Sequence, residues 1–143
     1  MAEVPPIRRE VIVEASPDVA FRVFTDRIGT WWPLAAHSVF GDGTVAFVDG
    51  TVIETSANGE QDVWGTVTDW DPPNHLAMTW HPGSTPDRAT AVEVSFSAAG
   101  DHTLVTLVHR GWEVYADPQA ASDEYEMGWP AVLAGFVTEV GAA

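Results

Sequence analysis

Two polar residues stand out in this sequence because they fall among apolar side chains on one face of a predicted sheet. Glu54 lies in the alternating segment 51–55, and His109 lies in a second alternating segment, 103–110. Burial raises the pKa of a carboxyl group, so Glu54 could act as a base while His109 donates a proton or anchors a ligand. Alternatively, both are buried polar groups satisfied by backbone, by Tyr125 or by water. Neither is assigned a catalytic role.

The register of the predicted strands sets how far apart these two residues lie. Asp49-Gly50 and Asn58-Gly59 are two-residue hairpin signals, and matching of apolar faces aligns the later strands. One predicted row contains Val45, Glu54, Val63, Trp80, Val92 and His109. The next contains Phe47, Val52, Gly65, Met78, Val94 and Leu107, and a third contains Val67, Leu76, Phe96 and Val105. Within the first row, Glu54 and His109 would be roughly 19 Å apart on a flat sheet, at about 4.8 Å per strand. Trp64 falls on the outer face.

A single helical stripe must cover this inner face. The segment Trp129 to Val140 places its large apolar residues at helical spacing: Trp129, Val132, Leu133, Phe136, Val137 and Val140. Pro130 either starts this helix or kinks it, because proline cannot donate the backbone hydrogen bond. The polar segment Glu113 to Asp123 is predicted to be a loop that leads into the helix.

The remaining elements are short and strand-rich. Arg8 to Ala15 alternates and predicts a first strand, which closes the sheet at one edge. Ser16-Pro17 is an N-cap followed by proline and opens a short helix, Pro17 to Thr25, before a second short segment, Ile28 to Trp32. From Thr44 onward the chain predicts a six-stranded antiparallel meander. The sequence therefore predicts one α+β domain, residues 1–143, in which a curved antiparallel sheet of about seven strands grips a long C-terminal helix, with a cavity between them.

Composition excludes several classes of function. The chain has 143 residues, a net charge of −15 and no cysteine, and its six basic residues are all arginine. An acidic surface repels phosphate backbones and anionic lipid, which disfavours nucleic-acid binding and membrane association. The missing lysine and cysteine remove Schiff-base, thiol and thiolate–metal chemistry. No segment approaches the length of a membrane span, and we expect no membrane insertion and a cytoplasmic protein.

Aromatic residues dominate the candidate ligand site. The seven tryptophans are unusual for a domain of this size, and large aromatic rings can either stack on a flat ligand or fill space. The predicted ligand-binding residues are Glu54, His109, Trp80, Phe47, Met78, Val92, Trp112, Tyr125, Trp129 and His37. His37 follows Trp31-Trp32-Pro33 at the expected cavity mouth, where an ordered loop is the alternative explanation. The five histidines show no metal-ligand spacing, so we predict no metal and no cofactor.

Several segments, in this order, resemble a known superfamily. They are IVEASPDVAFRVFTD (12–26), Trp31-Trp32-Pro33, WGTVTDWDPPNHLAMTW (64–80), VEVSF (92–96), TLVTLVHRGWE (103–113) and Gly128 to Leu133. Together they resemble the helix-grip fold of the START and Bet v 1-like superfamily, SRPBCC, and within it the group related to the C-terminal domain of the activator of heat-shock-protein-90 ATPase. A glycine pair typical of the group is replaced here by Val48-Asp49-Gly50. The resemblance implies an interior cavity for small apolar molecules but carries no activity.

Three functions remain open. The apolar inner face favours binding of a small hydrophobic or aromatic molecule, or of a lipid-like one, because it offers contact area and little chemistry. A cyclase or aromatase would use Glu54 and His109 as its acid–base pair. A protein-interaction module, resembling the chaperone activator or forming a homodimer, would present an outer patch around Trp64. We expect the first of these.

Overall fold

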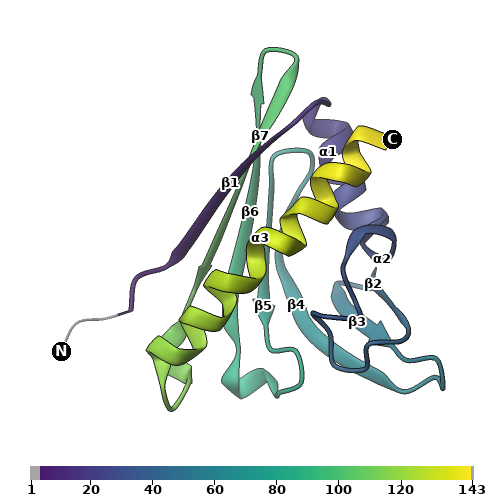
Figure 1. The fold of residues 1–143 in the computed structure, drawn as a ribbon. Helices are drawn as coiled ribbons and strands as arrows, with labels where there is room; N and C mark the ends of the chain where they lie inside the picture. Colours follow the sequence, from purple (N-terminus) through teal and green to yellow (C-terminus); the bar gives the residue numbers. More distant parts are fainter. Residues whose placement is uncertain (1–3, 143) are drawn as a thin grey trace.

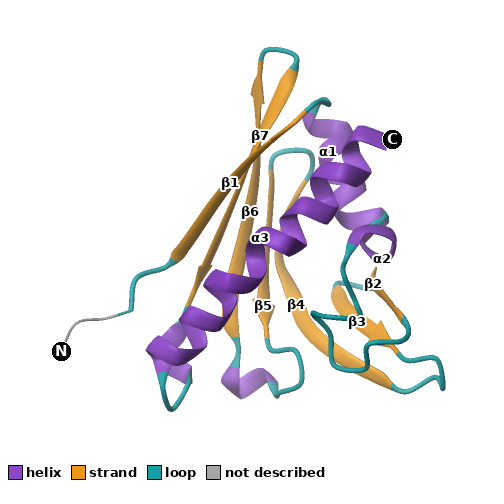
Figure 2. Cartoon of the chain, in the orientation of Figure 1, coloured by secondary structure: helices purple, strands orange, loops and turns teal. Residues whose placement is uncertain are grey.

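The computed structural model describes residues 4–142 and shows a curved sheet crossed by a long helix (Figure 1; Figure 2). The strands are β1 (Ile7–Val13), β2 (Thr44–Val48), β3 (Thr51–Thr55), β4 (Gln61–Asp71), β5 (His75–Trp80), β6 (Thr90–Ala99) and β7 (His102–Arg110). The helices are α1 (Pro17–Asp26), α2 (Ile28–Trp31) and α3 (Pro118–Ala142), with short 3-10 turns η1 (Pro86–Arg88) and η2 (Trp112–Val114). The antiparallel sheet has the order β1-β7-β6-β5-β4-β3-β2. This confirms the predicted α+β helix-grip architecture.

The outer hairpins have the predicted registers. Val48 pairs with Thr51 across a turn in which Asp49 and Gly50 both have positive φ, as a two-residue primed turn requires. The last hairpin, β6 to β7, places Val92 opposite His109. In these two hairpins, turn chemistry and matching apolar faces were sufficient to define the pairing.

Strand β4 departs from the predicted register. Val52 pairs with Gly65, but Ile53 pairs with Val63, so Trp64 is an extra residue in a β-bulge. The bulge turns the Trp64 side chain inward, where it is fully buried. The predictions of an outward-facing Trp64 and of a partner surface around it are therefore wrong.

The middle hairpins are also shifted. Val67 lies opposite Met78, and Met78 lies opposite Val92, whereas the prediction paired Val67 with Leu76 and Met78 with Val94. A shift of two residues keeps the same side chains on the inner face but changes their neighbours along a row. His109 consequently shares a row with Met78 and not with Glu54, so the predicted common row is wrong.

Helix α3 is longer than predicted because it begins at Pro118. Asp117 caps it, since its carboxylate accepts from the Ala120 N–H at 3.1 Å. Most of the predicted loop 113–123 is thus 3-10 turn and helix. Pro130 lies inside the helix and leaves the Glu126 carbonyl without a helical donor, and the Arg9 guanidinium of β1 donates to that carbonyl at 2.9 Å.

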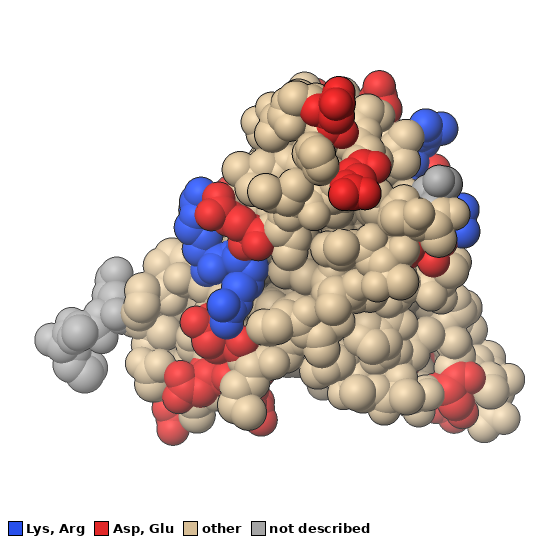
Figure 3. Space-filling view, turned by 45° about the horizontal axis from the view of Figure 1, so that its top comes forward, with Lys and Arg blue, Asp and Glu red and all other residues tan. Residues whose placement is uncertain are grey.

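The surface is acidic and carries few exposed large apolar side chains. Figure 3 shows acidic side chains spread over the visible face, with the arginines gathered next to some of them. Trp70, on β4, is 48 % exposed, and Met127, on α3, is 82 % exposed. Within residues 4–142, none of the helices combines the length and the hydropathy that crossing a bilayer requires.

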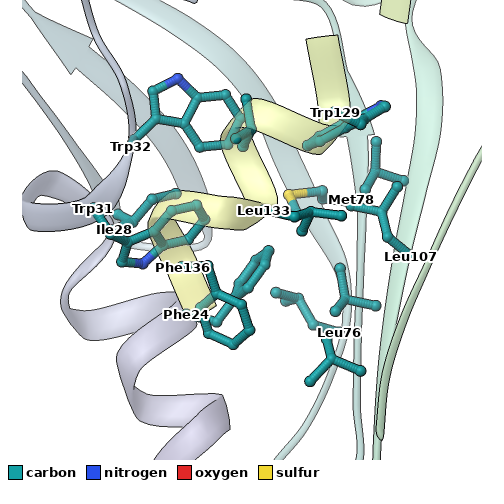
Figure 4. Packing of buried hydrophobic residues seen from close by; sticks show 14 of the residues in the cluster. Phe24, Ile28, Trp31, Trp32, Leu76, Met78, Leu107, Trp129, Leu133 and Phe136 are labelled. Atoms are coloured by element: carbon teal, nitrogen blue, oxygen red, sulfur yellow. The ribbon is translucent and has the colours of Figure 1, made fainter. Parts of the chain in front are cut away.

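The space between α3 and the sheet is filled with aromatic and aliphatic side chains. Figure 4 shows Leu133 and Phe136 of α3 directed into this space, with Phe24 of α1 and Leu76 of β5 close by. The Phe136 ring lies 5.3 Å from that of Phe24 and 5.4 Å from that of Trp31. The middle of the fold is therefore core, and open space is left beside residues 124–132 of the helix.

Candidate functional site

A pocket of about 420 Å³ opens between α3, the loop that follows α2, and the ends of β4 and β5. Its lining residues are Trp32, Ala36, His37, Ser38, Val39, Trp64, Trp80, Pro82, Glu124, Tyr125, Gly128, Trp129 and Val132. Four tryptophans from four different segments supply most of the aromatic wall. The pocket volume lies within the range typical of small-molecule sites.

The four tryptophan rings contact one another and leave ring surface facing the pocket. The Trp32 ring centroid lies 5.1 Å from that of Trp64, 5.8 Å from that of Trp80 and 6.0 Å from that of Trp129. Trp80 also lies 5.6 Å from Trp64 and 5.9 Å from Trp129. These rings hold each other in place, so the wall is formed before any ligand arrives.

Glu54 lies behind this wall and holds it together. Its carboxylate accepts the backbone N–H groups of Val39 and Phe40 at 2.8 and 2.9 Å, and the indole N–H of Trp64 at 3.1 Å. Burial by itself raises the pKa of Glu54, but these donors and the hydroxyl of Ser38 outweigh it and lower the pKa below 4.5. The side chain is thus an ionised acceptor with its oxygens already in use. It ties the loop at 38–40 to β3, and it is not poised as a base.

His109 is also fully engaged. Its Nδ1 accepts the indole N–H of Trp129 at 3.1 Å, so Nδ1 carries no proton. Its Nε2 lies 2.7 Å from the Thr90 hydroxyl, which in turn donates to the Trp80 carbonyl at 3.1 Å. Nε2 therefore donates to Thr90, and burial lowers the pKa of His109 to about 3. The imidazole is a neutral structural group that orients Trp129.

Tyr125, His37 and Glu124 are the ionisable side chains among the lining residues. Burial raises the pKa of Tyr125 well above 10, and nearby Tyr115 raises it further, so its hydroxyl keeps its proton. His37 stands at the mouth, where its ring packs against Gly128: a β-carbon added there would lie 3.3 Å from the His37 Cε1. Any larger residue at 128 would push the imidazole away from the helix.

The structure divides the predicted ligand-binding residues into three groups. Trp80, Tyr125, Trp129 and His37 line the pocket. Glu54 and His109 lie behind its wall and position tryptophans in it. The others are not among the lining residues: Phe47, Met78, Val92 and Trp112.

Trp32 and Trp64 also line the pocket, and neither was among the predicted ligand-binding residues. Gly65 was the available signal for Trp64, because a glycine within a strand often marks a bulge. A β-carbon at Gly65 would lie 1.8 Å from the Thr79 carbonyl oxygen, so only glycine fits where β4 and β5 approach. Among the described residues, no group of three histidines or acidic residues could hold a metal ion.

A curved antiparallel sheet around a C-terminal helix, with a pocket between the two, defines the helix-grip class of the SRPBCC superfamily. The family model for "Activator of Hsp90 ATPase homolog 1-like protein" matches residues 14–141, and the chain belongs to this family. No curated protein sequence is similar enough to count as a relative.

Solved structures with this fold include proteins of different roles. The chain is 35% identical to an anthrahydroquino-γ-pyrone synthase, Txn09, over 95% of this chain and 97% of the other, with a TM-score of 0.64. It is 26% identical to CalC of Micromonospora echinospora, described as a self-sacrificing resistance protein, with 95% and 94% coverage and a TM-score of 0.71. The Aha1 dimer from Colwellia psychrerythraea is 16% identical, with 96% coverage of both chains and a TM-score of 0.70, and shows the shared fold alone.

Proposed function

We propose that this protein binds a flat, oxygenated polycyclic aromatic molecule in the tryptophan-lined pocket. The observation that carries the proposal is the pocket of about 420 Å³, bounded by four tryptophan rings with Tyr125 and His37 beside them. Aromatic walls offer π-faces and edges that favour a rigid ring system over a flexible acyl chain. The lining exposes polar and apolar surface in about equal shares, which suits an aromatic ring system that carries oxygen substituents.

One of the similar proteins supports this ligand class. Txn09 has the highest sequence identity of the three structures described above, 35% over nearly the full length of both chains, and its name specifies a fused aromatic product. The proposal places the binding in the cytoplasm. A homodimer, the form described for the Aha1 structure, fits the same proposal when the pocket mouth stays free.

The test is a titration with a flat aromatic probe and a pair of matched variants. Ala36 and Ala35 are adjacent and exposed, but only Ala36 lines the pocket. We expect isothermal titration calorimetry with 2,6-dihydroxyanthraquinone to show saturable binding, weakened at least about tenfold by Ala36→Trp. Ala35→Trp should keep the wild-type affinity. Absence of saturable binding, or equal effects of the two variants, would count against the pocket as the site.

The similarity to a synthase favours a second candidate, a ring-closing enzyme acting on a ligand of the same class. Glu54 and His109 are unsuited to serve as its acid–base pair, because their hydrogen-bonding atoms are already engaged. His37 and Glu124 are the pocket residues that could take a proton from an attacking hydroxyl, and His37 is the one we test. The substrate to test is an anthrahydroquinone with an open side chain able to form a γ-pyrone. His37→Gln should abolish ring closure and leave binding within about twofold; turnover unaffected by the variant would rule out His37 as the base.

A further inference from the structure

Three of the four pocket tryptophans use their indole N–H groups within the protein. Trp32 donates to the His37 carbonyl at 2.7 Å, Trp64 donates to Glu54 at 3.1 Å, and Trp129 donates to His109 at 3.1 Å. Trp80 differs, because its buried N–H has no hydrogen-bond acceptor. A buried donor without an acceptor is costly, so this one calls for an explanation.

The candidate hydrogen-bond acceptor for the Trp80 N–H is the hydroxyl of Tyr125. Trp80 and Tyr125 both line the pocket, and the Trp80 ring lies 5.9 Å from that of Trp129, which Tyr125 also contacts. The Trp80 side chain opposes the rise in the pKa of Tyr125, although no hydrogen bond joins the two residues. Tyr125 is half-buried on α3, with its ring 4.7 Å from that of His109 and 6.2 Å from that of Trp129. A phenol oxygen can accept a hydrogen bond, so the Tyr125 hydroxyl is a candidate acceptor for the Trp80 N–H.

The two groups together have more donors than acceptors. An indole N–H only donates, whereas a phenol that accepts one hydrogen bond still has its own proton to donate. A hydroxyl that accepts from one partner also becomes a stronger donor to the next. Tyr115, which is not among the lining residues, is the competing acceptor for the Tyr125 proton within the protein. An acceptor on a ligand in the pocket would take that proton in its place.

The charge of the pocket limits what that acceptor can be. Of its described lining residues none is an arginine, and Glu124 lies among them. The whole chain carries a net charge of −15. An anionic group would be desolvated without a counter-charge, which is unfavourable. The ligand group must therefore accept a hydrogen bond and carry no negative charge. A carbonyl oxygen, which is neutral and has no proton of its own, meets both conditions.

We propose that Trp80 and Tyr125 form a donor relay for a carbonyl oxygen of the ligand: the Trp80 N–H donates to the Tyr125 oxygen, and the Tyr125 hydroxyl donates to the carbonyl. This inference rests on the proposed function and narrows its ligand class to flat aromatics with a ketone, quinone or pyrone carbonyl at the inner end. Tyr125 is the contact residue, and Trp80 positions it.

The test compares two probes that differ only in their carbonyl groups, 2,6-dihydroxyanthraquinone and 2,6-dihydroxyanthracene. We expect wild-type protein to bind the quinone about 3–10-fold more tightly, the factor that one hydrogen bond gives. Tyr125→Phe should remove this preference while leaving the affinity for the anthracene within about twofold. Trp70→Phe, at a half-exposed aromatic outside the pocket, serves as the control and should keep the preference.

The outcomes separate this inference from the function on which it rests. If both probes bind wild-type protein equally, or if Tyr125→Phe keeps the preference, the carbonyl relay is overturned and the flat-ligand proposal stands. If neither probe binds, the proposed function is overturned and the relay with it. A circular-dichroism spectrum and an unfolding midpoint for Tyr125→Phe would establish that a lost preference does not come from a lost fold.

Discussion

At the scale of single residues, the two side chains best suited by type to acid–base catalysis have structural roles. Glu54 and His109 each stand behind a pocket tryptophan and fix its indole N–H. Their burial was predictable from alternation, but their partners were not, because those come from loop 38–40 and from α3, far away in sequence. A buried polar group in an apolar row therefore indicates a site nearby without being its reacting group.

We predict that Glu54→Gln destabilises the protein by about 1–3 kcal/mol. Glutamine keeps one acceptor oxygen, but its amide NH₂ would face the N–H donors of loop 38–40 or of Trp64. Urea unfolding at pH 7 measures the loss. Glu60→Gln, at an exposed position beside the 58–59 turn, is the matched control and should stay within about 0.5 kcal/mol of wild type. Equal small effects of the two changes would mean that the Glu54 carboxylate does not hold the loop.

We predict that His109 stays neutral in the folded protein down to about pH 4. Its folded pKa of about 3 lies below its ordinary 6.5, so between these values the unfolded chain binds a proton that the folded chain does not. Stability is then complete above pH 6.5 and falls as the pH falls, by at most about 1.4 kcal/mol per pH unit. Nitrogen NMR should show an Nε2–H tautomer throughout. A midpoint near pH 6 for the His109 resonances would contradict the bonding described here.

At the scale of elements, the hairpins with clear turns were predictable and the bent strand was not. Asp49-Gly50 fixed β2 against β3 because both residues accept positive φ. Strand β4 carries extra residues at two places, shown by the register shifts after Val52 and after Val67. Alternation alone assumes that each residue faces one partner, so it misplaced Trp64 and the pairing of β4 with β5. Gly65 indicated the first bulge; we find no comparable signal at the second.

The start of helix α3 is a second feature that the local sequence pattern does not predict. Asp117-Pro118 is a cap and first-turn pair, yet Pro130 pointed to a later start because proline normally interrupts a helix. The helix continues through Pro130, with Arg9 of β1 supplying a donor to the Glu126 carbonyl. That compensation is a tertiary contact across more than a hundred residues, and local pattern cannot reveal it.

The packing of α3 on α2 gives a prediction at this scale. A β-carbon at Gly135 would lie 2.4 Å from the Trp31 carbonyl oxygen, whereas one at Gly141 meets nothing within 4 Å. Alanine is normally favoured over glycine in a helix by about 1 kcal/mol. We expect Gly141→Ala to be neutral or mildly stabilising and Gly135→Ala to be destabilising by about 1–3 kcal/mol, since the helices must separate. Thermal unfolding of both variants tests this, and stabilisation by Gly135→Ala would show that the helices do not pack this closely.

At the scale of the whole molecule, the structure has an open pocket where the sequence predicted an interior cavity. The reason is that aromatic rings fill the middle of the space between α3 and the sheet. Phe24, Trp31 and Phe136 pack against one another there. Hydrophobic patterning identified which residues face inward, and hence most of the core. How much space those rings leave, and where, depends on their volumes and rotamers together. For that reason Met78 and Val92 became core, while the loop after α2 supplied a wall of the site.

Electrostatics is the other property of the whole molecule, and it leads to a prediction about salt. The chain has 21 acidic and 6 basic residues, and four of the arginines already pair with glutamates at 2.6–3.6 Å. The unpaired acidic excess repels itself across a surface only a few Debye lengths wide, which disfavours the compact state. Raising NaCl from 10 to 300 mM at pH 7 should therefore raise the unfolding temperature by roughly 3–5 °C, about 1 kcal/mol for a chain of this size. The control is the same titration near pH 4.3, where the net charge approaches zero and the salt effect should vanish. An unfolding temperature that stays flat or falls with salt at pH 7 would mean that local ion pairs outweigh the net charge in setting stability.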